Sequence, residues 1–110
     1  MKQQYIMQNP TEAEILLAKE GYFLVESTIT QVNEHLSYPF LKYIRCQGYQ
    51  IDIKEKQIVA TRVCKDASSD SILLFDSAQM SISYDSHDSW LMASEVKAIY
   101  AKMQELNYYE

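Results

Sequence analysis

Two glycines and two prolines among 110 residues set the strongest limit on how this chain can fold. Glycine supplies the left-handed backbone angles of tight turns, and proline presets turn geometry. A chain this poor in both must be built mainly from regular helices and strands joined by few strained turns. The four residues, Pro10, Gly21, Pro39 and Gly48, therefore mark the places where elements begin and end.

Length and composition predict one folded domain. The chain has 47% hydrophobic and 23% charged residues, as ordinary globular proteins do, and 110 residues is close to the commonest domain size. No apolar run approaches the roughly 20 residues that a membrane span requires, and the first residues lack a secretory signal. We therefore expect a single α+β domain over residues 1–110 that is cytoplasmic, makes no membrane contact and keeps Cys46 and Cys64 as separate buried thiols.

The clearest helix signals surround Pro10. Asn9 can cap a helix, Pro10 suits its first position, and Glu12 lies where a capping-box carboxylate reaches back to the cap. Gly21 can take the left-handed conformation that ends a helix. These signals predict a helix over residues 10–20.

Residues 28–47 also carry a helical pattern. Ile29, Val32 and Leu36 recur at spacings of three and four, although the β-branched residues among them weaken the pattern. Pro39 cannot continue a helix, so we predict two short helices over this segment with a break near the proline.

After Gly48 the hydrophobic period changes from that of a helix to that of a strand. Tyr49, Ile51 and Ile53 alternate with polar residues, which is typical of a half-buried strand. We predict strands at residues 22–25, 49–53, 58–64, 72–75 and 80–84. Residues 22–25 can alternatively be a buried linker. The two segments that follow Gly48 form a predicted hairpin, and an antiparallel meander of the last four needs a cover on one face.

A stripe of apolar residues at helical spacing supplies that cover. Its members are Met92, Val96, Ile99, Met103 and Leu106. The helix can start at Ser86 or Asp88 and include Trp90, which we favour, or at Ser94 after a short strand over residues 90–93. The predicted fold is α+β, an antiparallel sheet of about four strands packed against N-terminal helices and a C-terminal helix.

One stretch carries all of the formal net charge of -5. Residues 66–96 contain no Lys or Arg but nine serines, and they contain six carboxylates: Asp66, Asp70, Asp76, Asp85, Asp88 and Glu95. Without these six, the net charge of -5 becomes +1 for the rest of the chain. Turns and helix caps favour serine and aspartate, so part of this composition can be loop chemistry. Loop chemistry does not explain the absence of cations, which indicates a surface of negative charge that attracts a basic partner.

Most of the aromatic residues are tyrosines, whose rings carry a polar hydroxyl group. Nine tyrosines stand against three phenylalanines, which suits half-buried positions and contact surfaces. We expect most of the tyrosines to border the core. Trp90, beside the acidic stretch, and Tyr108 and Tyr109, at the end of the chain, are the aromatic residues that we expect to meet another molecule.

Signals for chemistry are weak. Asp85, His87 and Asp88 have the side chains of a divalent metal site or a general base, but their spacing matches no metal or catalytic motif. Two glycines are too few for a glycine-rich phosphate loop, and ten basic residues scattered among fifteen acidic ones argue against direct nucleic-acid binding. We therefore predict a protein that is not an enzyme and needs no cofactor or metal.

These observations favour a small acidic interaction protein that binds and inhibits a basic protein, such as a nuclease or a nucleic-acid-handling complex, by occupying the surface that normally holds phosphate. Immunity proteins, antitoxins and phage-encoded anti-defence inhibitors are similar to it in size and composition. The predicted contact residues are Asp66, Asp70, Asp76, Asp85, Asp88, Trp90, Tyr108 and Tyr109.

Two alternatives stay open. The chain can be a structural or assembly subunit that forms a homodimer through a strand edge or its tyrosine-rich helix end. It can also be a metal-dependent hydrolase that uses Asp85, His87 and Asp88.

Overall fold

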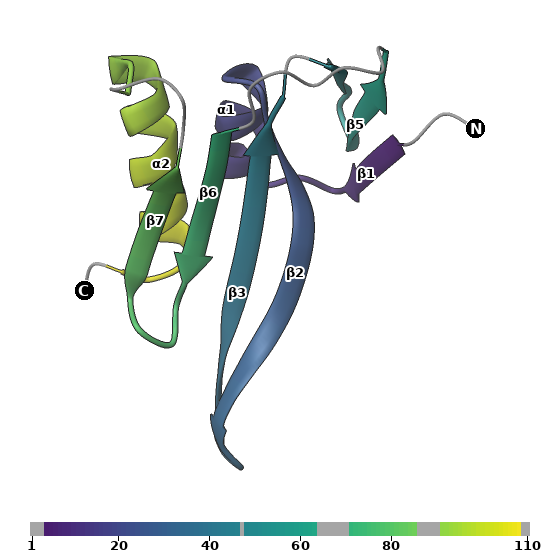
Figure 1. Ribbon diagram of the computed structural model, residues 1–110. Helices are drawn as coiled ribbons and strands as arrows, with labels where there is room; N and C mark the ends of the chain where they lie inside the picture. Colours follow the sequence, from purple (N-terminus) through teal and green to yellow (C-terminus); the bar gives the residue numbers. More distant parts are fainter. Residues whose placement is uncertain (1–3, 47, 64–70, 86–90, 109–110) are drawn as a thin grey trace.

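The computed structural model describes residues 4–46, 48–63, 71–85 and 91–108. In this part of the chain, two helices and seven strands form an α+β fold with two antiparallel sheets (Figure 1). Their bounds are β1 Gln4–Gln8, α1 Glu12–Lys19, β2 Tyr22–Asn33, β3 Leu36–Arg45, β4 Tyr49–Ile53, β5 Gln57–Arg62, β6 Ser71–Asp76, β7 Ser81–Asp85 and α2 Ala93–Glu105. The larger sheet has the strand order β2-β3-β6-β7 and the smaller one β1-β5-β4.

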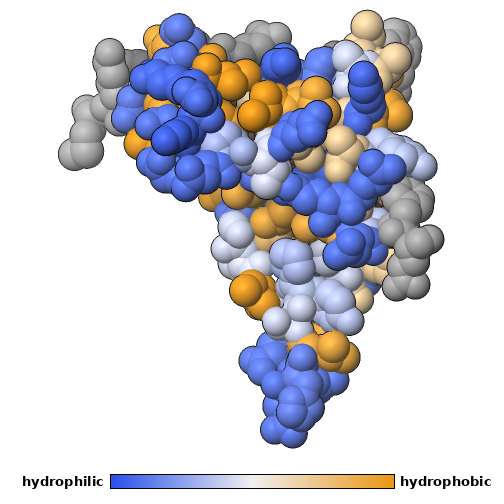
Figure 2. All heavy atoms as spheres, turned by 180° about the vertical axis from the view of Figure 1, so that it is seen from behind, coloured by the Kyte–Doolittle hydropathy of each residue, from blue (hydrophilic) through white to orange (hydrophobic). Residues whose placement is uncertain are grey.

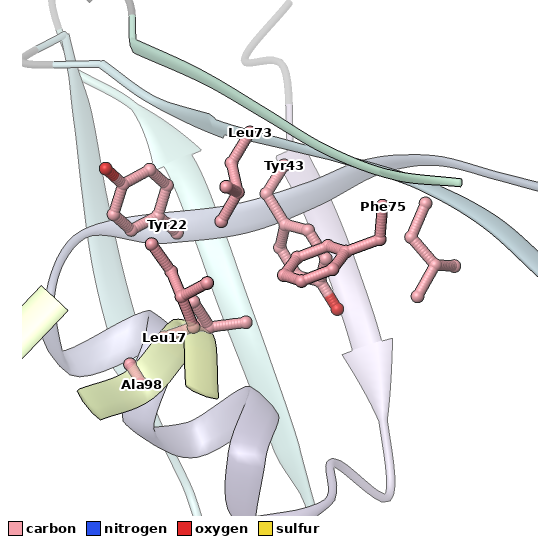
Figure 3. Close-up of a cluster of buried hydrophobic side chains, with 8 residues drawn as sticks. Leu17, Tyr22, Tyr43, Leu73, Phe75 and Ala98 are labelled. Carbon is pink, nitrogen blue, oxygen red and sulfur yellow. The ribbon is translucent and has the colours of Figure 1, made fainter. Parts of the chain in front are cut away.

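Both helices pack on one face of the larger sheet. Side chains alternate between the two faces of a strand, and the residues of β3 and β6 that face the helices are buried. The buried cluster joins three strands and both helices, and consists of Leu17, Tyr22, Leu41, Tyr43, Leu73, Phe75, Ala98 and Ile99 (Figure 3). The helices lie behind the sheet in the view of Figure 1, so the opposite face is turned toward the reader.

The prediction of two helices over residues 28–47 is wrong. These residues form most of the long hairpin of β2 and β3, in which Ile29 pairs with Pro39. Pro39 is tolerated because its backbone faces the β6 side just beyond the last residue of that strand. Its carbonyl accepts a hydrogen bond from Ser77 N at 3.1 Å, and its missing N–H removes no bond to β2. The β-branched residues of the segment favour the strand that is observed.

The predicted hairpin after Gly48 is confirmed as β4 and β5, but the predicted four-stranded meander is divided between two sheets. β5 pairs with β1, a strand that was not expected, and β6 pairs with β3. The smaller sheet contacts the larger one through aromatic rings. The rings of Tyr5 and Tyr49 lie 5.5 and 4.8 Å from that of Phe23 in β2.

The first helix is confirmed, but a different residue caps it. The Thr11 hydroxyl accepts a hydrogen bond from Glu14 N at 3.3 Å, and Glu14 Oε1 accepts one from Thr11 N at 3.2 Å, which completes a capping box. Asn9, the predicted cap, instead has a left-handed φ of 49° and donates its N–H to Lys56 O at 2.8 Å. Gly21 follows the helix with a φ of 94°, as predicted.

The C-terminal helix is shorter than we favoured. Leu91 and Met92 are in neither helix nor strand, which excludes both a long helix running through Trp90 and a strand over 90–93. The predicted stripe is split, because Ile99 is buried whereas Met92 and Val96 are exposed. The charged residues Glu95 and Lys102 take buried positions on this helix instead.

Candidate interaction surface

The face of the larger sheet that points away from the helices gathers acidic side chains around an apolar strip. We name it the open face. Strand alternation and register place these described residues on it: Phe23, Glu26, Thr28, Thr30, Tyr38, Phe40, Lys42, Ile44, Ile72, Leu74, Asp76, Ser81, Ser83 and Asp85. Phe23 is buried, because the rings of Tyr5 and Tyr49 in the smaller sheet pack against it, and the other residues lie beyond this contact. Their neighbours in β3 and β6, which point the other way, form the buried core.

The strip in the middle of the open face is apolar. Its members are all half-buried, and they are Tyr38, Phe40, Ile44, Ile72 and Leu74. Neither helix of the described residues covers them, because both helices pack on the other face. An apolar centre with a charged rim is the composition that protein interfaces share.

Three carboxylates and one ammonium group belong to the open face, which gives it a net charge of about -2. Glu26 stands directly opposite Lys42 in the β2–β3 register, whereas Asp76 lies opposite Phe40 and Ser81, and Asp85 opposite Ile72. No cation in the paired positions therefore offsets the two aspartates. They mark opposite ends of the β6–β7 hairpin, roughly 13 Å apart along the strands.

The structure describes only three of the eight predicted contact residues. Asp66, Asp70, Asp88, Trp90 and Tyr109 lie outside the described residues. Asp76 and Asp85 share the open face, the first half-buried and the second exposed. Asp76 Oδ1 also accepts a hydrogen bond from Gln79 N at 3.4 Å, so this carboxylate has a second role in the β6–β7 turn.

Two residues of the C-terminal half, the predicted contact residue Tyr108 and the carboxylate Glu95 of the acidic stretch, lie inside the fold. Tyr108 is only 9% exposed, because its ring stands edge-on to Phe75 and its hydroxyl donates to Ser81 O at 3.0 Å. Glu95, one of the six carboxylates of the acidic stretch, is 5% exposed. Neither side chain offers contact area in the isolated chain, so the acidic surface is smaller than the sequence indicates.

Glu95 is stabilised in the interior by two donors. Arg45 Nη1 donates to Glu95 Oε1 at 2.7 Å, and the Tyr22 hydroxyl donates to Glu95 Oε2 at 3.1 Å. Burial raises the pKa of Tyr22 well above its usual range. Burial alone would lower the pKa of the Arg45 guanidinium, but its hydrogen bond to Glu95 and the neighbouring acidic groups outweigh this and raise it. The carboxylate therefore serves to attach α2 to the sheet.

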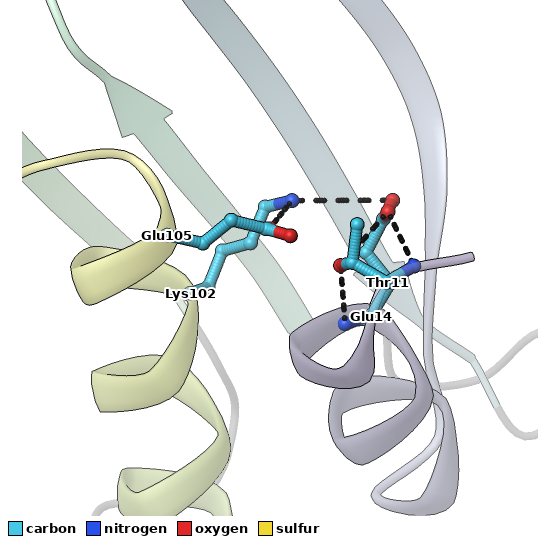
Figure 4. A network of polar contacts seen from close by, with 4 residues as sticks. All are labelled: Thr11, Glu14, Lys102 and Glu105. Carbon is cyan, nitrogen blue, oxygen red and sulfur yellow. Dashed lines mark hydrogen bonds and ion pairs between the residues drawn. The ribbon is translucent and has the colours of Figure 1, made fainter.

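A second charged cluster joins the two helices on the far side from the open face. Lys102 Nζ lies 2.5 Å from Glu105 Oε2 and 4.0 Å from Glu14 Oε2 (Figure 4). The Lys102 side chain is only 6% exposed, so its charge is balanced locally. Tyr43 reaches toward these carboxylates from β3, and its pKa is raised by burial and then by Glu14 and Glu105. This cluster holds α1 against α2.

The far part of the β2–β3 hairpin projects from the body. We name residues 26–37 the arm, and every one of them is exposed. The arm extends well past the β6–β7 turn in Figure 1, and Figure 2 shows separate hydrophobic groups along it above a hydrophilic tip. Ile29, Val32 and Leu36 are 71%, 56% and 47% exposed. These three aliphatic side chains give the projecting element exposed apolar area.

The sequence contains a charge signal for the arm, which the helix-like spacing of its apolar residues obscured. Residues 20–41 contain no Lys or Arg but three glutamates, Glu20, Glu26 and Glu34, so they form a second stretch without cations. At the tip, His35 Nε2 lies 3.5 Å from Glu34 Oε1, and both side chains are exposed. The arm therefore extends the acidic character of the open face.

No chemical site emerges from the described residues. None of their His, Cys, Asp and Glu side chains form a group of three or more that could hold a metal ion. Asp85 is exposed at the end of β7, while His87 and Asp88, its partners in the hypothetical metal site, are outside the described ranges. A groove of about 310 Å³ between α1 and α2 is lined by Glu12, Ala13, Leu16, Ala101, Gln104 and Glu105 and contains no nucleophile with a base beside it.

Within the described ranges, neither helix has the length and apolar character needed to cross a membrane. Comparison of the chain with protein-family models, with curated proteins and with solved structures found no match.

Proposed function

We propose that this protein is an interaction module that binds and inhibits a basic protein, with the open face as its contact surface. The observation that carries the proposal is the arrangement of that face. Two aspartates without opposing cations, Asp76 and Asp85, flank an apolar strip that the helices leave uncovered. The partner would be a nuclease or a nucleic-acid-handling complex, whose phosphate-binding surface is basic.

Each part of the open face has its own role in this mechanism. The carboxylates attract the basic surface over a distance and so speed the encounter, as complementary charges do in other complexes. The strip around Leu74 and Phe40 then excludes water and slows dissociation. A partner covered in this way cannot hold its nucleic acid at the same time, which is the basis of the inhibition.

The proposal is tested by capturing partners from the native cell with the tagged protein, identifying them by mass spectrometry and producing the captured protein in pure form. Association with the pure partner is then measured across a range of salt concentrations. The double variant Asp76→Asn and Asp85→Asn should associate several-fold more slowly at low salt and show a flatter salt dependence. Leu74→Ala should mainly raise the dissociation rate.

A matched control removes the same number of charges elsewhere. Glu12 at the start of α1 and Glu55 in the β4–β5 turn are both exposed and lie off the open face. Their double change to glutamine should leave association at low salt close to that of the native protein. Equal slowing by both double variants would mean that only net charge matters, and the open face would lose its assigned role.

A further inference from the structure

No described strand pairs with the outer edge of β2 in the arm, over a regular stretch of residues. β2 is the edge strand of the larger sheet, and the outer side of its lower half is open in Figure 1. Register shifts occur between Leu24 and Glu26 and between Gln31 and Asn33, so residues 26–31 form an uninterrupted strand between two bulges. Residues 27–33 contain no charged residue and no Pro, and both kinds of residue are commonly found on edges that are protected from pairing.

One hydrogen bond fixes which backbone groups point outward. Ser77 N donates to Pro39 O, so the carbonyl of Pro39 points toward the β6 side and away from β2. Pro39 is opposite Ile29, and in an antiparallel pair both residues then turn their N–H and C=O groups away from each other. Ile29 therefore presents both groups to the open edge, as do Ser27 and Gln31, which lie two residues to either side.

We infer that a second copy of this chain pairs with this edge, antiparallel and centred on Ile29. A two-fold axis at Ile29 places Ser27 of each copy opposite Gln31 of the other, so all three outward-facing residues are used by both copies. A two-fold pairing centred on a neighbouring residue would leave Ser27 or Gln31 opposite a residue outside the 27–31 set. The register of the arm is thus self-complementary.

The side chains agree with this pairing. Ile29, which is 71% exposed in the single chain, packs against Ile29 of the second copy, and the Ser27 hydroxyl faces the Gln31 amide. Glu26 falls opposite Val32, so no two carboxylates stand directly opposite each other. The two larger sheets become one continuous sheet, which joins their open faces. The inference does not depend on the proposed function, because it concerns an edge of the sheet and not a face.

The test uses the full chain alone. Light scattering coupled to size exclusion, over a wide range of protein concentration, should give a mass approaching twice 12.8 kDa. Ile29→Lys places two ammonium groups side by side at the two-fold axis and should raise the dissociation constant about tenfold or more. Ile29→Glu should do the same. An equimolar mixture of the two variants should recover the dimer, because the opposed charges are then opposite in sign.

Ile29→Pro tests the backbone bonds separately. The N–H that it removes faces the open edge and not β3, so the hairpin should stay intact while the dimer dissociates; Ile29→Val, which keeps the N–H, should remain dimeric. Circular dichroism checks that each variant is folded. A native chain that is monomeric at every concentration would overturn the inference, and so would a dimer that Ile29→Lys leaves unchanged or a mixture of the Lys and Glu variants that stays monomeric.

Discussion

Arg45 Nη1 and Glu95 Oε1 lie 2.7 Å apart under the first turn of α2, and this ion pair connects the helix to β3. The side chains are 26% and 7% exposed, so the carboxylate is almost fully removed from water. Tyr22 donates to its other oxygen, and Arg45 Nη2 donates to Ser71 Oγ at 3.3 Å. One helix and two strands of the larger sheet therefore meet at a single carboxylate, and Arg45 links it to a third strand, β6. The carboxylate is stable there because both of its oxygens have donors.

Removing both partners of this pair should cost less stability than the two single removals added together. Glu95→Ala leaves Arg45 without its counter-ion, and we expect a loss of about 3 kcal/mol in the free energy of unfolding, at the lower end for buried pairs because Arg45 is partly exposed. The double variant Glu95→Ala and Arg45→Met should lose less than the sum of the two single changes. Urea denaturation of the four proteins measures this. Losses that simply add would show that the two side chains are not coupled.

The start of α1 gives a second prediction, about the cap. Thr11→Ala removes the hydroxyl that accepts from Glu14 N and should lower the free energy of unfolding by about 1 kcal/mol. Asn9→Gly is the matched change at the residue that the sequence pattern favoured as the cap. Because Asn9 has a left-handed φ of 49°, glycine should be tolerated there without loss. A larger loss from Asn9→Gly than from Thr11→Ala, in the same denaturation experiment, would contradict the observed cap.

Local patterns predicted most elements of this fold but not their pairing. The period-two segments after Gly48 became β4, β5, β6 and β7, and the signals near Pro10 became α1. The segment from Ile29 to Leu36 was wrongly predicted as helix because Val32 lies at a register shift. A bulge there breaks the strand alternation and leaves the apolar residues at helix-like spacing. No local pattern encodes the pairing of β3 with β6, which joins residues about thirty positions apart.

The candidate site was predictable only in part, for similar reasons. The sequence marked Asp76 and Asp85 as acidic residues at strand ends, but only the register of β6 and β7 shows that they share a face. Glu95 looked like another surface carboxylate because its partner Arg45 is 50 residues away in the chain. A charge count along a sequence cannot distinguish a carboxylate that is paired in the interior from one that attracts a partner.

Two buried tyrosines of the core should respond differently to loss of the hydroxyl. Tyr22→Phe removes a hydrogen bond to the charged Glu95 and should lower the free energy of unfolding by about 1.5–3 kcal/mol. The Tyr43 hydroxyl has no hydrogen-bond partner among the described residues, so Tyr43→Phe should leave stability unchanged or raise it by up to about 1 kcal/mol. Both residues are 1% exposed, which makes them a matched pair for urea denaturation. Equal losses would contradict the assignment of hydrogen bonds.

The same tyrosines predict unfolding in alkali. Burial raises the pKa of Tyr22 and of Tyr43 far above the usual value near 10, and it also raises that of Tyr108. Above about pH 10 the unfolded chain loses these protons while the folded chain keeps them, so the folded state binds more protons and stability falls as the pH rises. This contribution is fully present below about pH 10 and is lost as the pH climbs toward the folded pKa. We therefore expect the tyrosinate absorbance of the buried rings to appear together with the loss of circular dichroism. Tyr43→Phe removes one of these groups and should make the fall of stability above about pH 10 less steep, whereas smooth titration of all nine tyrosines with an intact fold would refute the prediction.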